Sequence, residues 1–277
     1  GGDCELQNAA YAEGMTYWPI QPNFKPYEVD ASHPYFILDQ NRCILCRRCV
    51  RACGELVGNF TLGFEERGAE SRLVADLGVP MGESTCVSCG TCIQVCPTGA
   101  LIDRNSAYRG LETQVEHHET ICLGCSIGCG VDVLTRDNNL IRIEGNWEAP
   151  INKGIICKVG RFMPLDEQGE RIKTPLIRRD GVLQPASWDE AVKAVAAKMK
   201  TGNAAAIAST RLSAEALYQF KEMFQNATSL EENSIASVSA KLADETKGAF
   251  ESDLSAVQTA DMVLLVGADL ANNHEVA

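Results

Sequence analysis

Twelve of the thirteen cysteines in this 277-residue chain fall into three closely spaced sets. Two sets share the spacing C-x2-C-x2-C-x3-C, and the third is a C-x2-C-x3-C run followed by one distant cysteine. The sets are Cys43, Cys46, Cys49 and Cys53; Cys86, Cys89, Cys92 and Cys96; and Cys122, Cys125, Cys129 and Cys157. Thiols at this spacing are typical of iron–sulfur clusters, so the chain is expected to fold around several metal centres.

The first two sets have the spacing of bacterial ferredoxins, in which each cluster takes three thiolates from one run and the fourth from the other. The first 4Fe–4S cluster is therefore expected at Cys43, Cys46, Cys49 and Cys96. The second is expected at Cys86, Cys89, Cys92 and Cys53. A chain of this length needs no disulfide scaffold, and four cysteines within eleven residues would crowd a zinc site.

The third set encloses two stretches of alternating apolar and polar residues, 131–134 and 140–144, with an Asp-Asn-Asn turn between them. This pattern predicts a β-hairpin inside a small β-rich domain. A third 4Fe–4S cluster is expected there, at Cys122, Cys125, Cys129 and Cys157.

This third block, followed by T-P-L-I-R-R at 174–179 and S-W-D-E-A at 187–191, resembles molybdopterin oxidoreductases. Because a two-cluster module precedes it, the chain resembles the alpha subunit of NAD-dependent formate dehydrogenases. It is also similar to the large iron–sulfur subunit of respiratory NADH dehydrogenase (complex I). The resemblance covers nearly the whole chain and implies missing sequence at both ends.

The first residues, G-D-C-E-L-Q at 2–7, extend this resemblance. In the family a similar stretch carries the last cysteine of a cluster held by one His and three Cys. The other ligands would lie upstream of residue 1. Cys4 is therefore either a remnant ligand of a further cluster or a free thiol.

The predicted fold is α+β and multidomain. Residues 1–35 are expected to be a linker, with a short helix near Leu6–Glu13 and the remnant of an upstream iron–sulfur domain. Residues 36–110 are expected to form a two-cluster 4Fe–4S ferredoxin-like module, with a hairpin between 60–64 and 71–75. Residues 116–173 are predicted as a small β-rich 4Fe–4S domain of the molybdopterin oxidoreductase type.

Residues 174–277 are predicted to form a partial α/β doubly wound layer, as in molybdopterin oxidoreductases. Ser187 and Glu190 form a capping box that opens a helix through Lys200. A strand at 204–208, a helix from Ser213 to about residue 226 and an apolar strand at 262–267 complete the pattern.

The family resemblance also implies a test for a molybdenum or tungsten site. In formate dehydrogenases a Cys or selenocysteine of this layer ligates the metal, but the matching stretch 233–242 has neither and no cysteine follows Cys157. Catalytic members carry C-x-K-G-R, whereas here Val159 stands at the lysine position. The residues that resemble the pterin-nucleotide loop are Gly267, Asp269 and Asn272. A plain turn kept as scaffold is the favoured interpretation, and bound molybdopterin is not expected.

The composition argues against some classes of binding partner. A net charge of −12 and a pI of about 4.9 argue against nucleic acid and anionic membranes. No run of 18 apolar residues exists, so no direct membrane insertion is expected. Because clusters assemble on reduced thiols, a cytoplasmic location is predicted, with any position at the cytoplasmic face of the membrane set by partners.

Two groups of polar residues could either act at a cluster or be ordinary surface residues. The basic residues Arg42, Arg47, Arg48 and Arg51 interleave with the first run. They are either a solvated face or a positive charge that raises the potential of a cluster, and the second is the favoured interpretation. The stretch His117–Glu119 predicts a solvated linker, and His33 and His274 stand alone.

The predicted function is an electron-transfer subunit with three 4Fe–4S clusters and no Mo or W site of its own. It would connect a flavin-bearing, NADH-oxidising partner subunit with another redox subunit, because the chain has no flavin or nicotinamide motif. One alternative is a catalytic subunit of a molybdenum or tungsten formate dehydrogenase, and another is a structural docking subunit. Whether the isolated chain is itself an enzyme stays open.

Overall fold

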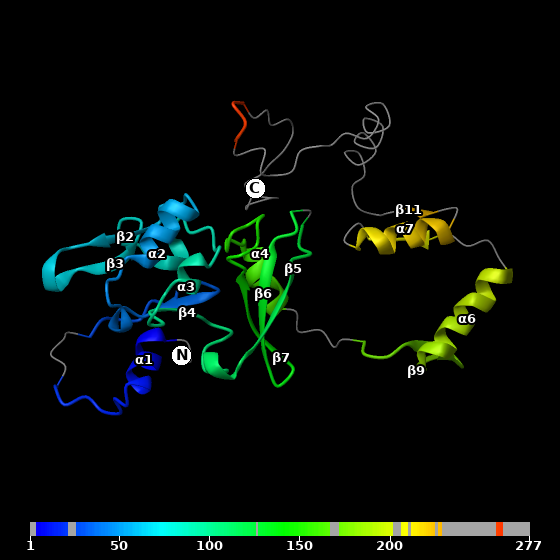
Figure 1. Ribbon diagram of the computed structural model, residues 1–277, viewed down its shortest axis with the longest axis horizontal. Helices are drawn as coiled ribbons and strands as arrows, with labels where there is room; N and C mark the ends of the chain where they lie inside the picture. Colours follow the sequence, from blue (N-terminus) through cyan, green and yellow to red (C-terminus); the bar gives the residue numbers. More distant parts are fainter. Residues whose placement is uncertain are drawn as a thin grey trace. The chain divides into compact units, whose positions relative to one another are not determined.

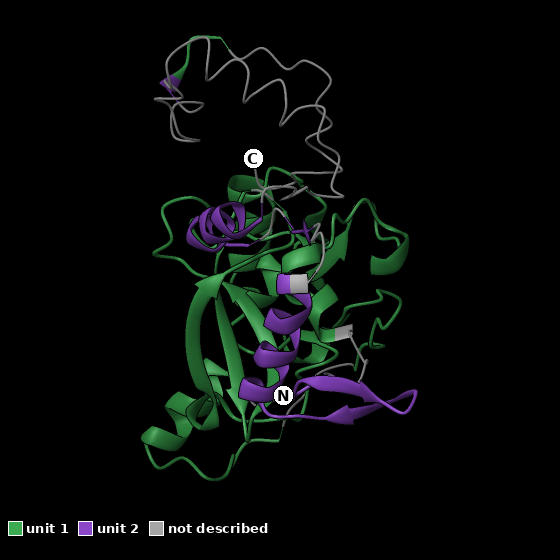
Figure 2. Ribbon diagram, turned by 90° about the vertical axis from the view of Figure 1, so that its right-hand side faces the viewer, with its two compact units in different colours: residues 1–167, 260–277 green, residues 168–259 purple. Residues whose placement is uncertain are grey.

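The computed structural model describes residues 4–21, 26–125, 127–166, 172–201, 206–209, 212–224, 227–228 and 259–262. Two compact units divide the chain: residues 1–167 with 260–277, and residues 168–259 (Figure 2). Within the described ranges, no helix is long and apolar enough to cross a membrane.

The N-terminal half of the first unit holds the first two cysteine runs (Figure 1). After helix α1 (Glu5–Ala12), strand β1 (Phe36–Leu38) pairs antiparallel with β4 (Leu101–Asp103), and β2 (Leu62–Glu65) pairs with β3 (Arg72–Ala75). The second pair is the predicted hairpin. The short helices are α2 (Arg48–Arg51), the π-helical turn η2 (Ala52–Leu56) and α3 (Thr91–Gln94). The 3-10 turns are η1 (Gln40–Arg42), η3 (Gly68–Glu70), η4 (Met81–Glu83) and η5 (Glu112–Gln114).

One apolar core supports both runs. It contains Phe36, Leu38, Leu62, Leu73, Ala75, Met81, Cys92 and Leu101, and Cys49, Cys53, Cys86 and Cys96 pack against it. The paired strands bring residues near 36 and near 101 to the same core. The two runs therefore share one apolar core, as the crossed pattern requires.

Cys122, Cys125 and Cys129 of the third set lie between the first two strands of a three-stranded antiparallel sheet, whose order is β5-β6-β7 (Figure 1). The strands are β5 (Glu116–Ile121), β6 (Gly130–Arg136) and β7 (Asn139–Gly145). Asp137 and Asn138 both have positive φ, as a tight hairpin turn between twisted strands requires. The hairpin predicted here is confirmed. Helices α4 (Lys158–Arg161) and α5 (Met163–Asp166) follow.

The prediction of a solvated linker at His117–Glu119 was wrong, because these residues lie within β5. All six side chains of β5 are exposed, and the strand is held by backbone pairing with β6, such as His118 opposite Val133. An edge strand that is polar on both faces shows no alternation in sequence, so pattern analysis could not find it.

The second unit begins with the hairpin of β8 (Leu176–Arg179) and β9 (Val182–Pro185). Helix α6 (Trp188–Thr201) follows, and its predicted cap is confirmed because the Glu190 N–H donates to Ser187 Oγ at 3.2 Å. Ser213 caps α7 (Ala214–Met223) in the same way. Strands β10 (Ala206–Ile207) and β11 (Ala227–Thr228), on either side of α7, pair in parallel. A parallel pair joined through a helix is the repeating unit of α/β layers.

Candidate iron–sulfur sites

The first two cysteine runs fold into loops of the same backbone shape. Leu45 and Ser88, each two residues after the first cysteine of its run, both have positive φ. So do Arg47 and Gly90, which cap α2 and α3. In each loop a backbone amide donates to the first thiol sulfur at 3.4 Å: Leu45 N–H to Cys43, and Ser88 N–H to Cys86. Amides turned toward cysteine sulfur are a property of loops that hold iron–sulfur clusters.

The first site is a cavity lined by Cys43, Cys46, Cys49 and Cys96. Its other walls are mostly apolar, and they include Ile44, Phe64, Leu73, Pro97 and Leu101. Cys96 belongs to the second run, so the structure brings together the same four cysteines that the crossed pattern groups. Burial, followed by the charges of Cys96, Cys43 and Cys46, raises the pKa of Cys49 to about 12.

The second site is more deeply buried than the first. The Cys92 side chain is 8% exposed, and burial raises its pKa well above the usual value. The thiols that act on it by charge include Cys89, Cys86 and Cys53. Burial also raises the pKa of Cys86 to about 11, against the effect of the Ser88 amide. Cys53 of the first run is therefore an electrostatic neighbour of the second run.

The third site is built from the loop before β6 and the helix after Cys157. The Gly124 N–H donates to Cys122 Sγ at 3.4 Å, which repeats the amide contact of the first two loops. Burial, followed by the charges of Cys122, Cys125 and Cys157, raises the pKa of Cys129 to about 11. A Cβ atom at Gly124 would lie 2.9 Å from Val159 Cγ1, so Val159 packs directly on this loop.

These residues fit 4Fe–4S clusters by their chemistry. Each set offers sulfur ligands in an apolar surrounding, with loop amides directed at sulfur. Buried thiols with raised pKa values stay protonated until a cation compensates the thiolate charge, so iron binding would release protons. In the part of the chain that the structure describes, no three such side chains converge as they would around a single metal ion. The four cysteines of the first site instead surround a space.

Arg161 is a residue of the second site that sequence reasoning missed. Its side chain is 3% exposed, and its Nε donates to the Cys89 carbonyl oxygen at 2.7 Å. Burial lowers the pKa of the guanidinium, against the attraction of Glu144, Cys89 and Cys92. Arg161 follows Cys157 within C-K-V-G-R, where only its position in a cluster motif could have drawn notice.

His33, expected to stand alone, lies against the second loop. Its Nδ1 accepts from the Tyr35 N–H, and its Nε2 is 3.2 Å from Ser88 Oγ. Because Nδ1 accepts, the neutral ring carries its proton on Nε2 and donates to Ser88. Burial, followed by the charge of Arg104, lowers the pKa of His33 to about 4. The ring is therefore neutral at physiological pH.

The basic residues of the first run form a solvated face. Arg42 pairs with Asp39 at 3.0 Å, Arg48 with Glu5 at 3.2 Å, and Arg51 with Glu55 at 3.0 Å. The Arg47 guanidinium lies 5.8 Å from the centre of the Phe64 ring. Of the two interpretations of this run, surface ion pairing is the one that the geometry favours.

Of the remaining predicted site residues, Cys4 lies within the described ranges. Cys4 caps α1, and its sulfur accepts from the Gln7 N–H at 3.3 Å. Outside the described residues lie Gly267, Asp269, Asn272 and His274, the stretch 233–242 and most of the strand predicted at 262–267.

Three family models match the chain in order. They are "4Fe-4S dicluster domain" over residues 42–100, "Molybdopterin oxidoreductase Fe4S4 domain" over 116–165 and "Molybdopterin oxidoreductase" over 171–277. The mixed fold with ferredoxin-like and molybdopterin oxidoreductase domains is thereby confirmed at this coarse level.

Curated relatives include NADH-quinone oxidoreductase subunits and putative formate dehydrogenases. An NADH-quinone oxidoreductase subunit of Rhizobium meliloti is 36% identical over 81% of this chain and 27% of its own length. A putative formate dehydrogenase of Staphylococcus haemolyticus is 28% identical over 99% of this chain and 33% of its own length. The chain thus spans a third or less of these relatives. Among solved structures, an NAD+-reducing NiFe-hydrogenase is 39% identical over 39% of this chain and 47% of its own, with a TM-score of 0.36.

Proposed function

The chain belongs to the iron–sulfur/molybdopterin oxidoreductase family, and from this premise we propose that it is an electron-transfer subunit with three 4Fe–4S clusters. It connects a flavin-bearing, NADH-oxidising partner with another redox subunit and has no molybdenum or tungsten site of its own. The observation that carries the proposal is the grouping of Cys96 with Cys43, Cys46 and Cys49 around one cavity.

When bound, each cluster supplies a site that gains and loses one electron without a change in protein bonding. The chain contributes twelve thiolate ligands in three sets: Cys43, Cys46, Cys49 and Cys96; Cys86, Cys89, Cys92 and Cys53; and Cys122, Cys125, Cys129 and Cys157. Its loop amides at Leu45, Ser88 and Gly124 donate to cysteine sulfur. Mostly apolar walls surround the cavity of the first set. A reducing compartment, the cytoplasm, suits twelve such thiols.

A second candidate function is a catalytic formate dehydrogenase subunit. The match of residues 171–277 to the molybdopterin oxidoreductase model favours it, as does the formate dehydrogenase relative aligned with nearly the whole chain. The stretch 233–242, which matches the metal-ligand segment of formate dehydrogenases, has no cysteine; this opposes the catalytic function, because the metal would then need an unusual ligand.

Metal and sulfide analysis of the anaerobically purified chain separates these functions. About twelve irons per chain, four for each of three clusters, without molybdenum or tungsten, is the expected result. One equivalent of molybdenum or tungsten would instead support the catalytic function. Iron far below twelve in a folded, cysteine-reduced preparation would contradict the three-cluster proposal.

A further inference from the structure

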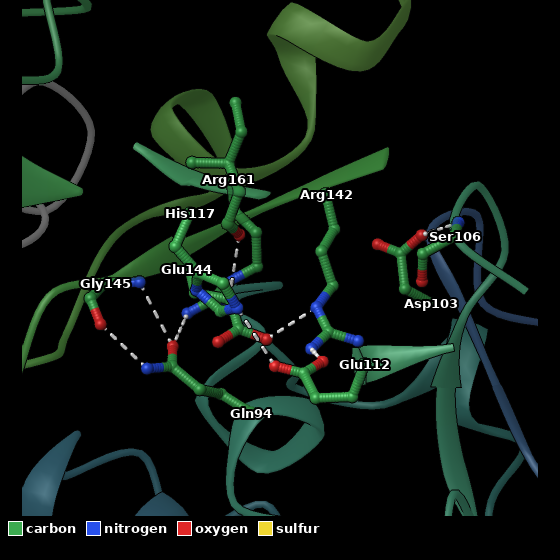
Figure 3. A network of polar contacts seen from close by, with 10 residues as sticks. Gln94, Asp103, Ser106, Glu112, His117, Arg142, Glu144, Gly145 and Arg161 are labelled. Atoms are coloured by element: carbon green, nitrogen blue, oxygen red, sulfur yellow. Dashed lines mark hydrogen bonds and ion pairs between the residues drawn. The ribbon is translucent and has the colours of Figure 1, made fainter. Parts of the chain in front are cut away.

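Arg161 carries a buried positive charge whose hydrogen bonds end on uncharged oxygens. Its Nε donates to the Cys89 carbonyl at 2.7 Å, and its Nη1 donates to the Ile143 carbonyl at 3.2 Å. Its Nη2 donates to Gln94 Oε1 at 2.8 Å (Figure 3). Cys89 lies in the second cysteine loop, and Ile143 lies in β7 of the third-site sheet. One side chain therefore joins two cluster domains.

Gln94 completes the junction from the other side. It is the last residue of α3, two residues after Cys92, and its Nε2 donates to the Gly145 carbonyl at 2.7 Å. Its Oε1 accepts both from Arg161 and from the Gly145 N–H, the latter at 3.1 Å (Figure 3). The Gln94 side chain thus hydrogen-bonds both backbone groups of Gly145, the last residue of β7, and so links this strand to α3. The next residue after Arg161, Phe162, stacks on Tyr35 with ring centres 4.5 Å apart.

The comparison of Gly90 with Arg47 shows that the second loop is shaped for Arg161. Both residues have positive φ in equivalent loops, yet the first loop accommodates a full side chain there. A Cβ atom at Gly90 would overlap Arg161 Cδ and lie 2.6 Å from its Nε. Glycine is therefore needed at this position because Arg161 approaches so closely. The backbone conformation alone does not require glycine.

Glu144 and Asp103 are the carboxylates that act on Arg161 by charge, and both have closer partners. Asp103 accepts from the Asn105 and Ser106 N–H groups, each at 2.7 Å, and a second arginine pairs with Glu144. Arg142 pairs with Glu112 at 2.6 Å and with Glu144 at 2.8 Å (Figure 3). Burying a cation costs free energy unless charge or hydrogen bonds compensate it. Neutral oxygens satisfy the hydrogen bonds of Arg161 without cancelling its charge, and the cysteines of the second loop would become anionic with iron bound.

We propose that Arg161 is a positioning residue for the second cluster, one that fixes the Cys89 loop against the third domain and raises the cluster's reduction potential. This inference rests on the proposed function, because it requires a cluster at Cys86, Cys89, Cys92 and Cys53. A positive charge beside the site favours the reduced, more negative state. The potential of one cluster thus depends on a residue of the neighbouring domain.

The test is a redox titration of the anaerobically purified chain, followed by electron paramagnetic resonance, with Cys92→Ser used to assign the second cluster's signal. Arg161→Gln removes the charge, and Gln94→Glu places a carboxylate against it with nearly the same shape. Both variants are expected to lower the second cluster's midpoint potential. Arg161→Lys keeps the charge and is expected to keep the midpoint potential close to that of the original chain. Arg51→Gln is the matched control, because Arg51 holds the position in the first run that Gln94 holds in the second.

The outcomes separate this inference from the proposed function. Iron analysis of the unaltered chain tests whether clusters are present at all, independently of Arg161. Suppose that the clusters are present and that Arg161→Gln and Gln94→Glu change the second cluster's potential no more than the control Arg51→Gln does. The inference is then wrong. If Arg161→Gln fails to assemble the cluster, the midpoint potential of the Gln94→Glu variant decides whether the inference holds. A role confined to holding the domains together would let Arg161→Lys shift the potential as much as Arg161→Gln, which also contradicts the inference.

Discussion

The first and second cysteine runs have the same spacing and the same loop shape, but they lie in different surroundings. In the first run the side chain of Arg51 is 71% exposed and pairs with Glu55, and Cys46 is exposed. In the second run the corresponding Gln94 and Gly90 contact Arg161, and Cys92 is buried. The ligand motif therefore sets the geometry of a site, while residues far along the chain set its electrostatics.

The crossed ligand pattern gives the largest expected effect. Cys96→Ser is expected to remove or damage the cluster of the first run and to leave that of the second run intact, because Cys96 lines the cavity of Cys43, Cys46 and Cys49. Iron content would fall by up to about four per chain. Cys53→Ser is the matched control and should affect the other cluster. Loss of the second cluster's resonance in Cys96→Ser would disprove the crossed assignment.

Gly90→Ala should be much more damaging than Arg47→Ala. Alanine at positive φ costs about 1–2 kcal/mol, and a Cβ atom that overlaps the Arg161 side chain adds overpacking of about 1–3 kcal/mol. Arg47→Ala keeps the same backbone and loses only a cation–π contact of about 0.5–1 kcal/mol. Denaturant unfolding, followed by cluster absorbance, measures both. Equal destabilisation would mean that the two loops are packed alike.

The different surroundings of the two cysteine runs could not be predicted from the sequence, although much of the local structure could. The cysteine spacing predicted which four thiols line the first cavity, the alternation at 131–144 predicted β6 and β7, and Ser187 predicted the start of α6. These features depend on neighbours in the chain. Arg161 and Cys89 are 72 positions apart, and no period or motif links them. The sequence instead drew attention to the arginines of the first run, which lie among the ligands but on the surface.

The neutral His33 ring predicts a pH dependence specific to the second loop. The pKa of His33 is about 4 in the folded chain and near 6.5 when unfolded. Between these values the unfolded chain binds more protons, so the free energy of unfolding falls as pH drops from 6.5 to 4. Above pH 6.5 the stabilisation is fully present. The expected loss across this window is on the order of 2 kcal/mol.

His33→Asn isolates this contribution from the acid lability of the clusters. The difference in unfolding free energy between the original chain and the variant should be constant above pH 7 and shrink toward pH 4. Asp30 and Arg104 are the charged groups that act on the ring, and both remain in the variant. A difference that does not change with pH would mean that folding leaves the pKa of His33 unchanged.

Arg51→Gln is expected to have the smallest effect, and it measures how far charge near a cluster matters in itself. The Arg51–Glu55 pair is exposed to solvent and spans one helical turn, so water and salt screen it. We expect no resolvable change in unfolding or in the first cluster's potential at physiological ionic strength. A clear downward shift of that potential, larger at low salt, would show that surface arginines tune the first cluster. The contrast between the two runs would then be one of degree, and burial of Arg161 would no longer explain why only the second loop responds to charge.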